Sequence, residues 1–279
     1  MPFRTQLCRF DAADGEALHG LLLRPENGEE SDLAIIQVHG VGGAFYRGIG
    51  SVVTEMLAER GWHAMPMNTR GHDWITRGRD PQAFIGSTYE NFADCLPDID
   101  GALTFLSSRG YRRFILYGQS LGAVKVVFYQ GMRQRPEVVG VIATSPPRQF
   151  YAARAIEQAD FAERMAEAEA MVEDGRGEDF IWAPTSGAMG VFTARTYVGK
   201  YGRNEQSDVR KQAAKFTVPL LTTAGGKESE FFHLHARELA EAAGPELGTW
   251  HIVEGANHQY TGREAILTDL VESWLRTVA

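Results

Sequence analysis

Short apolar runs alternate with amphipathic segments along most of the chain. Runs at 5–10 and 17–23 flank a turn-like segment and predict an antiparallel hairpin. The mostly apolar run Leu33–Val38 is typical of a strand buried on both faces. Strands and helices then alternate as far as residue 144, which requires crossover connections and predicts a parallel sheet. The expected strands are 62–67, 113–117 and 138–144, and the expected helices are 51–60, a helix through residues 97–106, and 121–133.

The alternation stops after Ser145-Pro-Pro147 and resumes near residue 216. The intervening sequence predicts one helix with an apolar stripe over 161–172, followed by a loop-rich stretch at 174–190. Beyond it we expect strands at 218–224 and 249–253 and helices at 232–243 and 263–277. The pattern therefore predicts an α/β fold with a mostly parallel central sheet flanked by helices. Residues 1–145 and 216–279 form its core, and residues 146–215 form a helical cap inserted above the sheet.

A candidate nucleophile lies where one predicted strand passes directly into a helix. Gly118-Gln-Ser-Leu-Gly122 is a G-x-S-x-G motif in the strand–turn–helix context that gives this motif its meaning. Glycines on both sides let strand and helix approach without a Cβ clash, while the serine takes strained backbone angles. Serine is also a good helix cap. The context favours Ser120 as the nucleophile of a hydrolase.

A serine hydroxyl needs a base, and in this context the partners follow in the order serine, acid, histidine. Among the histidines after the motif, only His258 falls on a loop at the carboxyl end of a predicted strand, which predicts it as the base. Glu228 and Glu230 both follow the strand at 218–224, where a carboxylate would orient the imidazole. Glu228 is favoured because Glu230 also suits the start of the next helix. Asp208 is a more remote third candidate.

The glycine-rich loop His39-Gly-Val-Gly-Gly43 follows the first buried strand. In the catalytic interpretation, the backbone N–H groups of Val41 and Leu121 form an oxyanion hole. The loop matches neither the dinucleotide-binding nor the phosphate-loop motif, so we expect no nucleotide cofactor. No paired His or Cys motif predicts a metal site.

Together these segments resemble the α/β-hydrolase superfamily over the whole chain. The matching segments, in the family's order, are the His39-Gly40 loop, Asn68–His72, the Ser120 motif, Pro219–Glu228 and Gly255–His258. The family usually has aspartate as its acid, and Glu228 stands at the aligned position. Asn91–Asp100 and Ser120–Lys125 are similar to a branch that includes siderophore esterases. This resemblance implies hydrolysis of an ester or amide in a sizeable polar metabolite.

The same loops contain candidate substrate-binding residues. The predicted set is His39, Gly40, Tyr46, Arg70, His72, Trp74 and, in the cap, Trp182. Arg70 would bind a carboxylate or phosphate of the substrate, or it would tie its own loop. Aromatic cap residues would either line an apolar pocket or hold the cap to the sheet.

The composition of the chain excludes several classes of binding partner. A net charge of −8 argues against nucleic acid and against an acidic membrane surface. No apolar run is long enough to cross a bilayer, and the first ten residues lack a signal-peptide core. Cys8 and Cys95 are expected to be reduced thiols. We therefore expect a cytoplasmic protein whose partner is a small-molecule substrate, and the sequence leaves a homodimer open.

The sequence thus predicts a metal-free serine hydrolase that cleaves an ester, thioester or amide through an acyl-enzyme. Two alternatives remain at this stage. The same residues serve hydrolysis of a carbon–carbon bond or a lactone, or the chain is a non-catalytic binding protein that has kept the fold.

Overall fold

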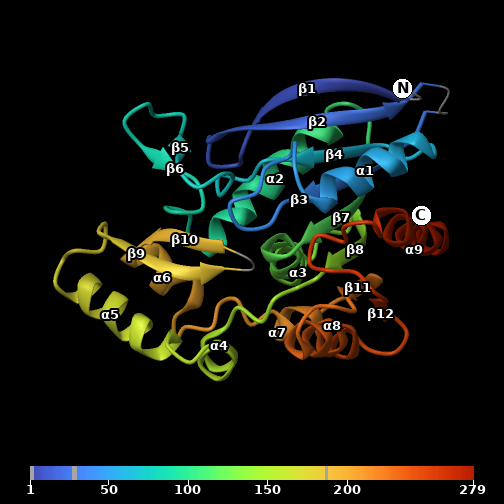
Figure 1. Cartoon of the computed structure of the whole chain (residues 1–279). Coiled ribbons are helices and arrows are strands. Elements are labelled where there is room, and N and C mark those ends of the chain that lie inside the picture. The colour runs from blue at the N-terminus through green and yellow to red at the C-terminus, as the bar shows by residue number, and fades with distance from the viewer. Residues whose placement is uncertain (1–2, 27–29, 186–187) are drawn as a thin grey trace.

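A computed structural model describes residues 3–26, 30–185 and 188–279. Its centre is an eight-stranded sheet in the order β1-β2-β4-β3-β7-β8-β11-β12 (Figure 1). β1 and β2 form the predicted antiparallel hairpin, β2 pairs antiparallel with β4, and the strands from β4 to β12 run parallel. The strands of the sheet are β1 (Phe3–Asp11), β2 (Ala17–Pro25), β3 (Leu33–Val38), β4 (Ala64–Met67), β7 (Arg113–Gln119), β8 (Val138–Thr144), β11 (Leu220–Gly225) and β12 (Gly248–Val253). The predicted mostly parallel α/β sheet is confirmed.

Helices cover both faces of this sheet. The helices that pack on it are α1 (Ile49–Glu59), α2 (Cys95–Ser107), α3 (Leu121–Arg133), α8 (Glu230–Ala243) and α9 (Glu264–Val278). α1 and α9 contribute to one apolar cluster, and α2, α3 and α8 contribute to the other. Successive residues of β3 alternate between the two clusters, with Ile35 in one and Ile36 in the other. β3 is therefore buried on both faces, as its continuous apolar run predicted.

Most of the elements between β8 and β11 lie beside the sheet, at the lower left of Figure 1, whereas α7 (Arg210–Ala213) lies next to α8. The others are α4 (Tyr151–Glu157), α5 (Phe161–Glu173), β9 (Phe180–Thr185), β10 (Ala188–Thr193) and α6 (Ala194–Tyr201). α5, β9, β10 and α6 share a third apolar cluster, which includes Phe161, Phe192 and Tyr197. α7 packs instead against α3 and α8. The division into core and cap at residues 146 and 215 stays a prediction.

The prediction of a loop-rich stretch at 174–190 is wrong. β9 and β10 pair as antiparallel strands, with Ile181 opposite Phe192 and Ala183 opposite Gly190. The proline and glycines in this stretch suggested loops, but Ile181 and Ala183 are buried on either side of the exposed Trp182. That alternation is the strand signal, and the third apolar cluster stabilises it. Residues 186 and 187 of the stretch lie outside the described residues.

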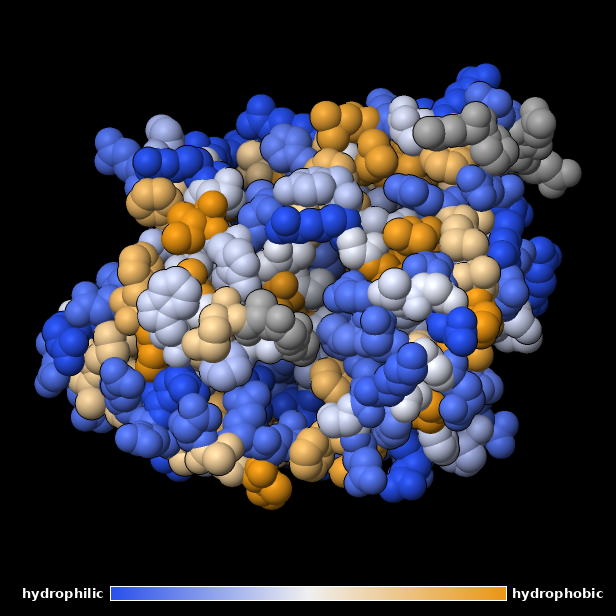
Figure 2. All heavy atoms as spheres, viewed as in Figure 1, coloured by the Kyte–Doolittle hydropathy of each residue, from blue (hydrophilic) through white to orange (hydrophobic). Residues whose placement is uncertain are grey.

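Three short elements lie in the loops after β4. They are β5 (Thr76–Arg77), β6 (Phe84–Ile85) and the 3₁₀ helix η1 (Phe92–Asp94). β5 and β6 form a small antiparallel pair that projects beside the main sheet (Figure 1). The surface on this side mixes hydrophilic and hydrophobic residues, with the hydrophobic ones in small groups (Figure 2).

Candidate active site

Ser120 occupies a sharp turn between β7 and α3. Its backbone angles are φ 57° and ψ −125°, a conformation that a side chain rarely adopts. A Cβ on Gly118 would collide with the backbone of Gly122, and a Cβ on Gly122 would collide with the carbonyl oxygen of Val38. Both glycines are therefore needed for strand β7, helix α3 and strand β3 to approach one another here. The result is a serine held at the carboxyl edge of the sheet, at the start of a helix.

The structure brings His258 and Glu228 to this serine. His258 Nε2 lies 3.1 Å from Ser120 Oγ, and His258 Nδ1 lies 2.6 Å from Glu228 Oε1. Glu230 is the exposed first residue of α8, and Asp208 pairs with Arg210 at 2.8 Å. Among the three acids considered from the sequence, it is Glu228 that contacts the imidazole.

A buried hydrogen-bond network surrounds the Glu228 carboxylate. Its Oε2 accepts from the backbone N–H of Gly225 and from Ser145 Oγ, both at 2.6 Å, and the side chain is only 3% exposed. Ser145 Oγ in turn lies 3.0 Å from the Tyr260 hydroxyl, which lies 3.1 Å from Thr223 Oγ1. Burial raises the pKa of Tyr260 well above its usual range, so the phenol stays protonated. These contacts hold the carboxylate in one orientation toward His258.

Sequence reasoning missed Ser145 and Tyr260. Both have positive φ, 49° and 53° respectively, which is uncommon for residues other than glycine. The one available signal was position, because Ser145 directly follows β8 and Tyr260 comes two residues after His258. Neither position shows by itself that the side chain points toward an acid on another strand.

The loop after β3 lies directly against the serine. A Cβ built on Gly40 would be 3.0 Å from Ser120 Cβ, a tight contact that a larger residue could make only if the serine shifted. His39 Nδ1 lies 2.8 Å from Gly40 O, and its Nε2 accepts from the N–H of Thr69 at 3.1 Å. Burial, with the nearby Lys125, lowers the pKa of His39 to about 3. His39 is therefore neutral, donates from Nδ1, and ties the Gly40 loop to the loop after β4.

Val41 and Leu121, whose backbone N–H groups the sequence analysis proposed for an oxyanion hole, both lie near Ser120. Leu121 is the first residue of α3, where no carbonyl of the helix accepts its N–H. Val41 follows Gly40 and borders the space next to Ser120.

The whole chain aligns with solved structures of low sequence identity. It is similar to Est1E from Butyrivibrio proteoclasticus (18% identity, TM-score 0.70, covering 97% of this chain and 98% of that one). It is also similar to the esterase Pf2001 from Pyrococcus furiosus (17%, TM-score 0.68, 99% and 92%) and to the hypothetical protein PA2218 from Pseudomonas aeruginosa (14%, TM-score 0.74, 100% and 94%). The chain has the α/β-hydrolase fold. No protein-family model and no curated protein sequence matches it.

In this α/β-hydrolase fold two cavities meet at Ser120 and Val41. We call them the inner cavity, of about 280 Å³, and the cap-side cavity, of about 300 Å³. The inner cavity is bordered by His258 and by two buried glutamines, Gln37 and Gln119. The cap-side cavity is bordered by Ser120, Val41, Pro147, Arg148, Gln149, Arg154, Glu157, Gln158, Pro184, Thr185, Tyr201, Ser229, Phe231 and Phe232. Ser120 therefore borders both cavities.

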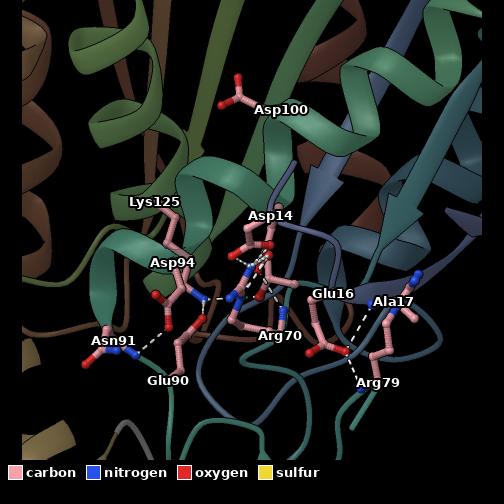
Figure 3. Close-up of polar contacts among 12 residues, drawn as sticks. Asp14, Glu16, Ala17, Arg70, Arg79, Glu90, Asn91, Asp94, Asp100 and Lys125 are labelled. Carbon is pink, nitrogen blue, oxygen red and sulfur yellow. Dashed lines mark hydrogen bonds and ion pairs between the residues drawn. The ribbon is translucent and has the colours of Figure 1, made fainter. Parts of the chain in front are cut away.

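Only two of the seven predicted substrate-binding residues, His39 and Gly40, border these cavities in the part of the chain that the structure describes. The side chains of the other five are engaged or turned elsewhere. The Tyr46 hydroxyl donates to Asp73 at 3.1 Å, His72 contacts Asp73 at 2.8 Å, Arg70 binds Asp98 and Asp14 at 2.8 Å, Trp74 packs on Phe192, and Trp182 is 61% exposed (Figure 3 shows Arg70 beside Asp14). The position of a loop at the sheet edge therefore does not fix the direction of its side chains.

A second feature missed from the sequence is a buried charge cluster below the site. Glu90 pairs with Lys125 of α3 and, at 3.0 Å, with Lys200 of α6, and all three side chains are at most 1% exposed (Figure 3 shows Glu90 and Lys125). Burial alone would raise the pKa of Glu90, but the two ammonium groups lower it to about 2. The cluster joins α6 to the core of the fold.

Two further observations concern the described residues alone. None of their helices has the length and apolar character to cross a membrane. Nor do three or more of their histidine, cysteine, aspartate or glutamate side chains gather in a group able to hold a metal ion.

Proposed function

We propose that this protein is a serine hydrolase that cleaves a carboxylic ester through an acyl-enzyme. The observation that carries the proposal is the continuous chain of contacts from Ser120 Oγ to His258 Nε2 and from His258 Nδ1 to Glu228 Oε1. A serine at a strained elbow, a histidine within reach and a buried acid behind it are the parts that this chemistry needs.

In the proposed first half-reaction, Ser120 Oγ attacks the carbonyl carbon while its proton passes to His258 Nε2. The carbonyl oxygen becomes an oxyanion that accepts hydrogen bonds from the N–H groups of Val41 and Leu121. Glu228 stabilises the imidazolium across the 2.6 Å contact with Nδ1. The bond between the carbonyl carbon and the leaving oxygen then breaks, and His258 gives its proton to the departing alcohol.

In the proposed second half-reaction, His258 removes a proton from water, and the hydroxide attacks the acyl carbon. The tetrahedral intermediate collapses, the bond to Ser120 Oγ breaks, and His258 returns the proton to the serine. The acid half of the substrate leaves as a carboxylic acid. Oxidation states do not change, so no redox cofactor is needed.

The similar structures favour an ester over the other bonds that this machinery serves. Pf2001 is described as an esterase, and Est1E has been solved with ferulic acid bound. Thioesters and amides use the same steps and differ in leaving group. No specific contact among the described residues of this site favours hydrolysis of a carbon–carbon bond or a lactone. None favours a purely binding role either.

The test is labelling and turnover with Ser120→Ala, using Ser108→Ala at the exposed end of α2 as the matched control. The wild type and the control should react with a fluorophosphonate probe and hydrolyse 4-nitrophenyl acetate. Ser120→Ala should do neither, with turnover lower by about a thousandfold or more. Labelling or turnover of Ser120→Ala at the wild-type rate would refute the proposal.

A further inference from the structure

The cap-side cavity has an unusual balance of charge. Its charged border residues are two arginines, Arg148 and Arg154, and one carboxylate, Glu157. Ser120 borders the same cavity. Part of any substrate that reacts at Ser120 and extends to the cap side therefore passes a wall with excess positive charge.

Arg154 of α4 is the most enclosed of these charges. The residue is 7% exposed, and its Nη1 and Nη2 donate to the side-chain oxygens of Gln149 and Gln158 at 2.7 and 3.0 Å. Its guanidinium carbon lies 4.6 Å from the centre of the Tyr201 ring. Gln149, Gln158 and Tyr201 all border the cavity, so the guanidinium is held within its wall.

What Arg154 lacks is a counter-ion. No described carboxylate forms an ion pair with it, and its buried Nε has no hydrogen-bond partner. Its two acceptors are neutral amides, which orient the guanidinium without neutralising it. The Glu157 carboxylate attracts Arg154 only from beyond ion-pair distance. Burying a charge without a close counter-ion opposes folding, so such a group is expected where a ligand supplies one.

Arg148 borders the same cavity and forms only long ion pairs. Its nearest carboxylates, on Glu157 and Glu238, lie 3.5 and 3.7 Å away, at or beyond the limit of a hydrogen bond, and its Nε is also unpartnered. Arg70, the arginine that the sequence suggested as an anion site, is by contrast fully paired, since Asp98 and Asp14 both lie at 2.8 Å. The arginines near Ser120 that lack a close ion pair therefore border the cap-side cavity.

We propose that the cap-side cavity binds a carboxylate carried by the substrate, with Arg154 as its principal partner and Arg148 as a second cation. The substrate class is then an ester that has a free carboxylate on one of its two halves. This inference rests on the proposed function, since the scissile bond must lie at Ser120. A guanidinium fits a carboxylate because its planar N–H groups match the two oxygens.

The experiment compares ester pairs in which a free carboxylate of one member is a neutral methyl ester in the other. On the acyl side, the pair is 4-nitrophenyl hydrogen glutarate and its neutral methyl ester. On the alcohol side, it is 4-acetoxybenzoate and methyl 4-acetoxybenzoate. The wild type should prefer the carboxylate member of at least one pair by about tenfold or more in kcat/KM, the range expected for a charge-assisted contact. A wild type that prefers neither carboxylate overturns the proposal without any variant.

Three variants assign the preference to Arg154. Arg154→Gln should lose it, by lowering kcat/KM for the carboxylate ester while leaving the neutral ester within about twofold. Arg154→Lys keeps the charge without the planar fork, and should keep part of the preference. Arg195→Gln removes an exposed charge of α6 that pairs with Glu178, and should behave as the wild type. A full carboxylate preference retained by folded Arg154→Gln overturns the assignment to Arg154. A loss of the preference in Arg195→Gln overturns it as well.

The neutral esters separate this inference from the function on which it rests. If neutral esters are hydrolysed and Ser120 is labelled, but the carboxylate esters are not preferred, the anion site is wrong and the hydrolase remains. If Ser120 is neither labelled nor needed for turnover of the neutral esters, the hydrolase proposal fails first. Circular dichroism of each variant verifies that it is folded.

Discussion

Replacing Glu228 by glutamine tests how the acid controls the histidine. The amide has one acceptor and one donor end, and the structure decides which end faces His258. The backbone N–H of Gly225 donates to Oε2 at 2.6 Å, and a backbone donor cannot be reversed. The amide oxygen must therefore take that site. The amide –NH₂ is left facing His258 Nδ1, where the carboxylate oxygen lay at 2.6 Å.

This orientation forces the imidazole into the unproductive tautomer. An amide N–H can only donate, so Nδ1 becomes the acceptor and the ring proton moves to Nε2. Nε2 faces Ser120 Oγ at 3.1 Å and can then no longer accept the serine proton. In a triad of the same kind, the wrong tautomer lowers turnover by about ten-thousandfold. We expect a loss of that order in kcat for Glu228→Gln, with KM little changed.

The assay is hydrolysis of 4-nitrophenyl acetate, with Glu230→Gln as the matched control. Glu230 is exposed at the first residue of α8, where its charge contributes only about 0.3–1 kcal/mol to the helix and nothing to turnover. The fluorophosphonate labelling rate should fall in parallel with turnover for Glu228→Gln. A Glu228→Gln enzyme within tenfold of the wild type would refute the tautomer argument. A crippled Glu230→Gln enzyme would move the acid to Glu230.

Three further outcomes are expected. Glu90→Gln leaves two buried ammonium groups without a counter-ion and should lower the free energy of unfolding by about 3–5 kcal/mol. Lys200→Met leaves Glu90 paired with Lys125 and should lower it by less. Equal losses of the two variants in urea denaturation would contradict this. Burial lowers the pKa of His39 to about 3 and that of His235 to about 4, so the unfolded chain binds more protons than the folded chain below pH 6.5. Each histidine should therefore lower the free energy of unfolding by about 2 kcal/mol between pH 7.5 and pH 5. His235→Gln should make the measured pH dependence of stability less steep. EDTA should leave turnover unchanged, because the proposed steps use only side chains and backbone N–H groups; loss that zinc restores would argue otherwise.

Local pattern predicted much of the fold. The bounds of β3, α3 and β8 agree with those read from the sequence, because each is a mostly apolar run with polar or turn-forming residues at its ends. The Ser120 turn was equally visible, since Gly118 and Gly122 are required by contacts within a few residues and with the adjacent strand. The β9–β10 hairpin was missed because its strand alternation is short and interrupted by proline and glycine.

The candidate site was predictable only where chain order constrains it. The order of serine, acid and histidine led to Ser120, Glu228 and His258, and their loops do meet at the carboxyl edge of the sheet. The substrate-binding residues were chosen from loops at the sheet edge and from the cap, yet Tyr46 and Trp182 border neither cavity. A strand's end positions a loop, whereas a side chain's direction depends on the packing and charges around it.

The sequence alone therefore determined the layered architecture and the location of the candidate nucleophile, because hydrophobic periodicity and glycine sterics act over short distances along the chain. Only the tertiary structure decided that Ser145 and Tyr260 hold Glu228 in place and that Arg70 is neutralised while Arg154 is not. Hydrogen bonding and charge compensation depend on distances between residues far apart in sequence, and those distances exist only once the chain has folded.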